Sequence, residues 1–183
     1  MRKFIRVAAL GAVIAATTLA TPQAFARSAP DGERLVAGTG VHLTARGAQN
    51  LDTRAVAAAD PAAVGAATTL CGSGYKLDNA ERLPDARRFG TLFTYTKDVR
   101  GAYGVCSVFE NNTSGAKHMK LKLCAGLREG GCKADEGTYS QYAGPVKIES
   151  GNPMYMNCPP VTAIMWSGST AIIDRVRSAT PCD

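Results

Sequence analysis

The sequence predicts an all-β protein, a small disulfide-stapled sandwich or barrel of about six to eight short antiparallel strands. Three observations lead to this prediction. Apolar and polar residues alternate along several short segments, most clearly from His118 to Cys124. Turn-forming residues separate such segments, as at Asn111 to Gly115 and at Ser167 to Ser169. All six cysteines lie beyond residue 70, where they can cross-link one compact region.

Each predicted strand follows from alternation or from a high content of β-branched and aromatic residues. In the clearest one, three apolar side chains share one face and two lysines the other (Met119, Leu121 and Leu123 against Lys120 and Lys122). The strands are expected at 90–96, 103–110, 118–124, 146–149, 161–166 and 170–176. One helix of about a turn is expected between Asn79 and Arg88, where Pro84 limits its length.

The N-terminus has the pattern of a secretory signal peptide over residues 1–26. Three cations lie within the first six residues, an uncharged and mostly apolar stretch covers 7–21, and Ala24-Phe25-Ala26 provides a cleavage site. The apolar stretch is shorter than the roughly 20 residues of a membrane span. The sequence therefore predicts a secreted, extracellular chain without a membrane anchor.

Residues 27–70 are expected to be an Ala-rich flexible leader, and residues 71–183 the β domain. No aromatic residue occurs between Arg27 and Leu70, so this stretch offers little bulky apolar surface to offset its ordering entropy. The leading interpretation includes a leader that is flexible or partly helical, and the alternative is a cleaved pro-segment or a tether to the cell envelope. Leu35 to Leu43 could form a strand.

The charge of the chain gives no support to nucleic-acid binding. The chain has 21 Lys and Arg against 15 Asp and Glu. Removing the three signal-peptide cations leaves 18 against 15, so the net charge falls from +6 to +3. Half of the basic excess therefore belongs to a segment that is expected to be removed, and no nucleic-acid partner is predicted.

The six cysteines are predicted to form three disulfides, because their number is even and the chain is expected outside the cytoplasm. They are Cys71, Cys106, Cys124, Cys132, Cys158 and Cys182. Of fifteen possible pairings, the most local joins them in that order, and its middle bridge would clip a hairpin with its tip at Arg128 to Gly131. In the chain-entropy model the three bridges contribute about 3.8, 2.6 and 3.5 kcal/mol as upper-range values. A zinc site is disfavoured because no C-x-x-C pair exists and the domain has one histidine, His118.

Several motifs in this order resemble the spore-associated protein A family, small secreted proteins of filamentous, spore-forming actinobacteria. They are the segments Cys71 to Tyr75, Gly90 to Tyr95, Val105 to Val108 and Tyr139 to Val146. The similarity covers most of residues 71–183 and none of the leader. It implies attachment to spores or to the aerial cell surface, and it brings no catalytic residues. The family usually has four cysteines, so Cys124 and Cys132 read as an addition.

No catalytic residue, metal ligand or cofactor site is predicted. Ser73 lies between two glycines but lacks the nucleophile-elbow pattern. His118 has no recognisable nucleophile partner in the sequence, and it lies in an alternating strand. Asp135 and Glu136 form an acidic pair without a second acid at a defined distance, as glycosidase chemistry would require.

Aromatic residues are the candidate contact groups, and Tyr95, Tyr103, Tyr142 and Trp166 are predicted to contribute to surface contact, alongside the lysines at 120, 122 and 147. The expected partner is the spore wall or another cell-wall polymer. The leading hypothesis is a secreted, non-catalytic protein of the spore or cell surface. The alternatives are an extracellular binding module for cell-wall glycan or for a protein, including an inhibitor, and, with less support, a hydrolase.

Overall fold

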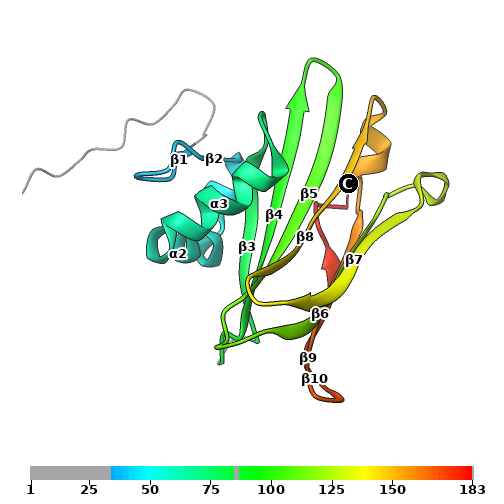
Figure 1. Ribbon diagram of the computed structural model, residues 1–183. Helices are drawn as coiled ribbons and strands as arrows, with labels where there is room; N and C mark the ends of the chain where they lie inside the picture. The colour runs from blue at the N-terminus through cyan, green and yellow to red at the C-terminus, as the bar shows by residue number, and fades with distance from the viewer. Residues whose placement is uncertain (1–33, 85–86, 183) are drawn as a thin grey trace, which may run out of the picture.

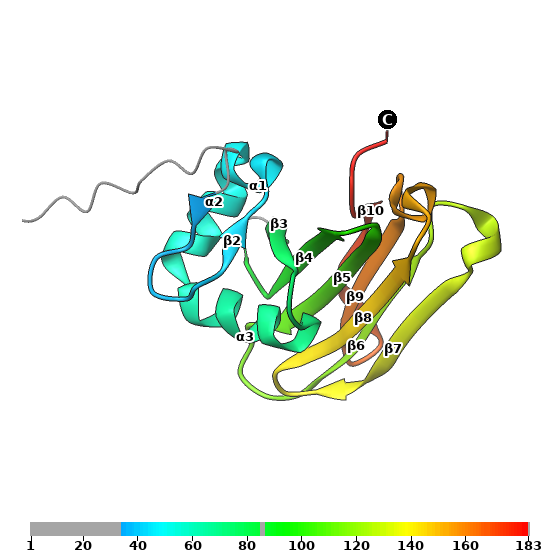
Figure 2. The same cartoon turned by 90° about the horizontal axis from the view of Figure 1, so that it is seen from above.

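The computed structural model describes residues 34–84 and 87–182. The expected signal peptide, residues 1–26, lies outside the described residues. The described chain forms three layers: helices cover one face of a larger β-sheet, and a smaller sheet covers its other face (Figures 1 and 2). The two sheets are not closed into a barrel, so of the two predicted all-β architectures the sandwich is the one observed.

The larger sheet has six strands in the order β1-β2-β3-β4-β5-β8. All neighbours are antiparallel except β2 and β3, which pair in parallel through Leu43 and Leu77. The strands are β1 (Arg34–Leu35), β2 (His42–Leu43), β3 (Lys76–Leu83), β4 (Gly90–Val99), β5 (Ala102–Asn111) and β8 (Tyr142–Ser150).

The smaller sheet has four antiparallel strands in the order β10-β9-β6-β7. They are β6 (Lys117–Cys124), β7 (Cys132–Tyr139), β9 (Pro160–Ser167) and β10 (Thr170–Ser178). Two short 3-10 helices, η1 (Arg128–Gly130) and η2 (Pro153–Met156), lie in the connections. The predicted turn at Ser167 to Ser169 joins β9 to β10 as a hairpin. The turn at Asn111 to Gly115 instead carries the chain from one sheet to the other.

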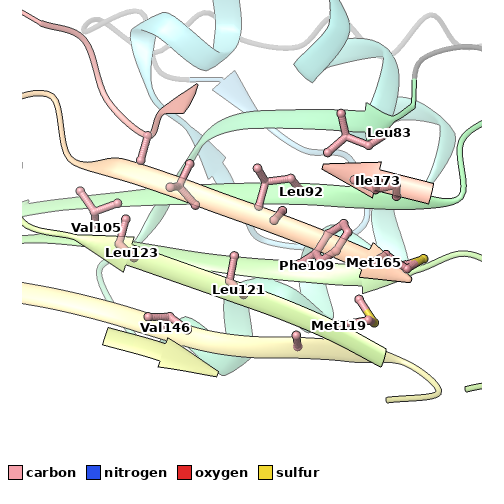
Figure 3. Packing of buried hydrophobic residues seen from close by; sticks show 14 of the residues in the cluster. Leu83, Leu92, Val105, Phe109, Met119, Leu121, Leu123, Val146, Met165 and Ile173 are labelled. Atoms are coloured by element: carbon pink, nitrogen blue, oxygen red, sulfur yellow. The ribbon is translucent and has the colours of Figure 1, made fainter. Parts of the chain in front are cut away.

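The core between the sheets follows from the alternation seen in the sequence. Met119, Leu121 and Leu123 of β6 are fully buried. They meet side chains such as Leu92 and Phe109 from the larger sheet (Figure 3). The intervening residues of β6 point to the other side of the smaller sheet. The strand alternation therefore predicted both the buried face and the exposed face of this element.

The helical layer differs from the expected flexible leader. Residues 34–70 form β1, β2 and most of three helices, α1 (Ala45–Gln49), α2 (Leu51–Ala59) and α3 (Pro61–Cys71). The helices begin at three polar caps, Thr44, Asn50 and Asp60, whose side-chain oxygens each accept a backbone N–H of the first turn. Short helices in close succession, each with its own cap, are thus encoded locally.

A second core explains why this Ala-rich segment is ordered. Val56 and Val64 of the helices are buried against Leu77, Phe93 and Tyr95 of the larger sheet. The bulky side chains of this interface come from the strands, whereas the helices contribute mainly small residues that allow a close approach. The composition of residues 27–70 alone therefore could not predict that these helices pack on the sheet, because the side chains that they pack against belong to strands later in the sequence.

The one helix that the sequence predicted is a strand. The segment from Asn79 to Leu83 belongs to β3, which pairs along its length with β4. Pairing with a long neighbouring strand outweighs the weak helical preference of the segment. The strand ends at Leu83, immediately before Pro84, so the proline still marks the boundary of the element.

The three disulfides are the predicted local ones. Cys71–Cys106 ties the end of α3 to β5, Cys124–Cys132 joins directly paired residues of β6 and β7, and Cys158–Cys182 ties the segment before β9 to the C-terminal segment. The first bridge fastens the helical layer to the sheet. The second closes the predicted hairpin, whose tip contains η1.

Candidate surface-binding face

The side of the smaller sheet that faces away from the core is the best candidate for a contact surface. Strand alternation places one set of side chains from β6, β7, β9 and β10 on this side. We call it the outer face, defined by His118, Lys120, Lys122, Glu136, Ile164, Trp166, Asp174 and Val176. The opposite side of the same strands carries the buried core residues, so the sheet presents this set to solvent.

An aromatic pair occupies one end of the outer face. Trp166 of β9 and His118 of β6 are directly opposite in the strand register, and their ring centroids are 4.7 Å apart with the planes inclined at 48°. Ile164 follows on the same face of β9, and Val176 of β10 is 62% exposed. Trp166 and Ile164 form an apolar strip along β9, and Val176, which pairs with Thr162, lies diagonally beyond Ile164 next to Asp174. An apolar strip beside hydrogen-bonding groups suits amphipathic ligands.

Ion pairs hold the polar half of the outer face in place. The Glu136 carboxylate lies 2.8 Å from Lys120 Nζ and 3.2 Å from His118 Nε2. The hydrogen bond from Lys120, and next that from His118, holds the pKa of Glu136 below its ordinary value. The outer face carries two lysines and the carboxylates of Glu136 and Asp174, so these charges balance in number.

Tyr95, predicted as a surface contact, is buried in the second core with no exposed surface. Its hydroxyl donates a hydrogen bond to the backbone carbonyl of Val64 in α3, at 2.8 Å. Burial raises the pKa of Tyr95 above its ordinary value. The prediction that Tyr95 is a surface contact is therefore wrong, because the helices cover the face of β4 that would otherwise be exposed.

The other predicted contact residues lie in separate places. Tyr103 lies at the start of β5 and lines a groove of about 510 Å³ with residues of η2 and the C-terminal segment. Tyr142 packs against the second core, on the helical side. Lys147 also faces that side, where its ammonium donates to the carbonyl of Cys71 at 3.2 Å. Of the predicted contact residues, Trp166, Lys120 and Lys122 share the outer face, whereas Tyr142 and Lys147 share the helical side of β8.

The residues considered for catalysis are kept apart. Ser73 follows α3 on the helical side of the larger sheet, whereas His118 lies on the outer face of the smaller one. Asp135 and Glu136 point to opposite faces of β7. Asp135 accepts 2.6 Å hydrogen bonds from the Tyr139 hydroxyl and from the N–H of Gly144, so its carboxylate links β7 to β8.

Metal ligation and membrane insertion were also considered for residues 34–84 and 87–182. No three His, Cys, Asp or Glu side chains in these ranges come together as a possible metal site. None of the helices described is long and apolar enough to cross a membrane.

Three members of the outer face were missed by sequence reasoning. Ile164, Asp174 and Val176 lie in strands that were predicted correctly, but all three were interpreted as ordinary strand residues. The signal was present in the alternation of β9, where Val161, Ala163 and Met165 are buried and the even positions face outward. What the sequence lacked was the pairing of β9 with β6, which sets His118 beside Trp166.

Comparison with known proteins identifies a relative of this chain by sequence. No protein-family model and no solved structure matches the chain. The chain is 32% identical over 115 residues to Spore-associated protein A of Streptomyces coelicolor, and the match spans 61% of this chain and 71% of that protein. The expected resemblance is therefore confirmed, and the chain belongs to the spore-associated protein A family.

Proposed function

We propose that this protein is a secreted, non-catalytic component of the spore or cell surface, and that its outer face binds a wall polymer. The name of the Streptomyces coelicolor relative supports the spore association. The three disulfides and the N-terminal export pattern support a location outside the cytoplasm, because disulfides persist in oxidising surroundings.

One observation carries the choice of surface: Trp166 and His118 lie side by side on the outer face with their rings inclined at 48°, and Ile164 follows Trp166 along β9. An indole ring offers a rigid apolar plane with an N–H at its edge, which suits contact with an amphipathic sugar ring. Lys120 and Glu136 lie in the next cross-strand row and can exchange hydrogen bonds with sugar hydroxyls.

The charge balance of the outer face determines how the attachment should respond to salt. The two lysines and two carboxylates of the outer face balance in number, so attraction to an anionic polymer contributes little. Screening by salt weakens contacts between exposed charges but leaves apolar contacts in place. Retention on a wall should therefore resist a salt wash.

A binding module for soluble glycan or for a protein partner is the second candidate, and the same apolar strip favours it. A hydrolase has less support, because Ser73 and His118 lie in different layers and the carboxylates of Asp135 and Glu136 point apart. A measurable glycosidase or peptidase activity that is lost on His118→Ala would revive that alternative.

Co-sedimentation with purified walls of Streptomyces coelicolor spores tests the proposal. The purified protein should pellet with the walls, and most of it should remain there in 1 M NaCl. Trp166→Ala should reduce the bound fraction severalfold. Val99→Ala is the matched control, since Val99 is 45% exposed at the far end of β4 and should bind as the unmodified protein does. Equal binding by all three proteins would refute the assignment of the outer face.

A further inference from the structure

A second surface feature, unrelated to the outer face, lies beside the helical layer. The β1–β2 hairpin runs alongside α2, as Figures 1 and 2 show, and an open groove of about 540 Å³ separates the two. This volume lies within the range of about 300–1,000 Å³ that is typical of small-molecule sites. The groove is mostly apolar, and it is formed by parts of the chain that the sequence assigned to a flexible leader.

The walls of the groove expose apolar side chains to an unusual extent. Leu51 is 74% exposed and Leu35 is 53% exposed, and they lie on opposite walls. Along α2 the groove continues over Ala55 and Ala58, which share the face of Leu51 at helical spacing. The small alanines keep this wall low, so the apolar groove stays open along the helix beside the two leucines.

Among the residues that the structure describes, two arginines are the charged side chains that line the groove. Arg34 lies on the hairpin wall and Arg54 on the helix wall. Both are exposed, and neither takes part in an ion pair or hydrogen bond among the residues that the structure describes. By contrast, Arg46, Arg175 and Arg177 are all paired with carboxylates. Two unpaired guanidinium groups beside an apolar groove are complementary to an anion that carries a hydrocarbon chain.

The few hydrogen-bonding groups in the walls of the groove favour an alkyl chain over a peptide as its ligand. A peptide brings a donor and an acceptor with each residue, and these need partners when they are buried. The backbone of α2 is bonded within the helix, and β1 is only two residues long, so the groove offers few such partners. A single alkyl chain needs none, and its one polar end can bind the arginines.

We propose that this groove binds a long-chain fatty carboxylate, with the alkyl chain along Leu35, Leu51 and Ala55 and the carboxylate bound by Arg34 and Arg54. The proposal does not depend on wall attachment, because the groove and the outer face lie in different layers of the molecule.

A fluorescent fatty acid, 11-(dansylamino)undecanoate, is the probe for this site on the purified, oxidised protein. We expect saturable binding that unlabelled palmitate displaces. Ala55→Trp should fill the groove and weaken binding at least tenfold, whereas Ala59→Trp should leave it unchanged. Ala59 is the matched control because it is exposed on the same helix but does not line the groove.

The double change Arg34→Gln and Arg54→Gln tests the head group. It should weaken palmitate binding at least fivefold and methyl palmitate binding much less. Trp166→Ala should leave palmitate binding unchanged, which separates this result from the test of the outer face. Absence of saturable binding, equal effects of the two tryptophan substitutions, or equal affinity for palmitate and its methyl ester would each overturn the proposal. A dimer that Ala55→Trp dissociates would show that a second copy covers the groove instead.

Discussion

Tyr95 offers the sharpest test of how the helical layer relates to the sandwich. If residues 34–70 were a flexible leader, the side chain of Tyr95 would face solvent on β4, and its removal would change stability little. In the structure it is fully buried beneath α3, and its hydroxyl bonds to the carbonyl of Val64. Tyr95→Ala and Tyr95→Phe therefore probe two different parts of one contact.

The expected magnitudes follow from what each substitution removes. Tyr95→Phe removes one neutral hydrogen bond, at a cost of about 0.5–1.5 kcal/mol in the free energy of unfolding. The carbonyl of Val64 keeps a partner, because it also accepts the Thr68 hydroxyl at 2.8 Å. Tyr95→Ala removes a fully buried ring and leaves a cavity, at a cost of about 3–5 kcal/mol. That is a large part of the net stability of a small domain, about 5–15 kcal/mol.

Urea unfolding of the oxidised protein, followed by far-UV circular dichroism, measures these differences. Tyr103 provides the control, because it is a partly exposed tyrosine in the neighbouring strand β5. Tyr103→Ala should cost clearly less than Tyr95→Ala. If the two alanine variants were equal within about 0.5 kcal/mol, the size of an ordinary surface effect, the helical layer would not cover the sheet as described.

Three further predictions concern the bridges, the outer face and the N-terminus. Replacing Cys124 and Cys132 by serine should be the mildest removal of a cysteine pair, at about 2.6 kcal/mol or less, because its loop is the shortest; chemical denaturation of the three double variants checks the ranking. The pKa of Glu136 should lie below the ordinary value of about 4.3, and it should rise in Lys120→Met. The ion pair should therefore be fully formed at a pH above that ordinary pKa and be lost as the pH falls through the lowered pKa of Glu136. An NMR titration that placed the midpoint at or above the ordinary value would contradict this. N-terminal sequencing of secreted protein should begin at Arg27, and an intact Met1 would refute the predicted export.

Sequence reasoning succeeded where the information is local. The period-two pattern of β6 predicted its buried and exposed faces, since alternation alone decides which side of a strand a residue occupies. The Cys124–Cys132 bridge was equally accessible, because its two residues flank a single hairpin. Element boundaries marked by a proline or by a glycine-rich turn were placed within a few residues.

The failures share one cause, which is dependence on partners far away in the sequence. The helices around Val64 carry mostly small residues, and the aromatic rings that order them, Phe93 and Tyr95, belong to a strand some thirty residues later. The segment of β3 is a strand because β4 lies beside it. Likewise, the contact of His118 with Trp166 depends on the register between β6 and β9, which no local pattern contains.

The central claim is that the protein is retained on the spore or cell surface through its outer face, and fractionation of a sporulating culture tests it most directly. Streptomyces coelicolor would secrete a tagged form of the protein or its Trp166→Ala variant, and spore walls and medium would be compared by immunoblot. We predict that the unmodified protein follows the wall fraction through a high-salt wash and that the variant shifts to the medium. Unmodified protein recovered mainly from the medium, or both proteins distributed alike, would contradict the claim.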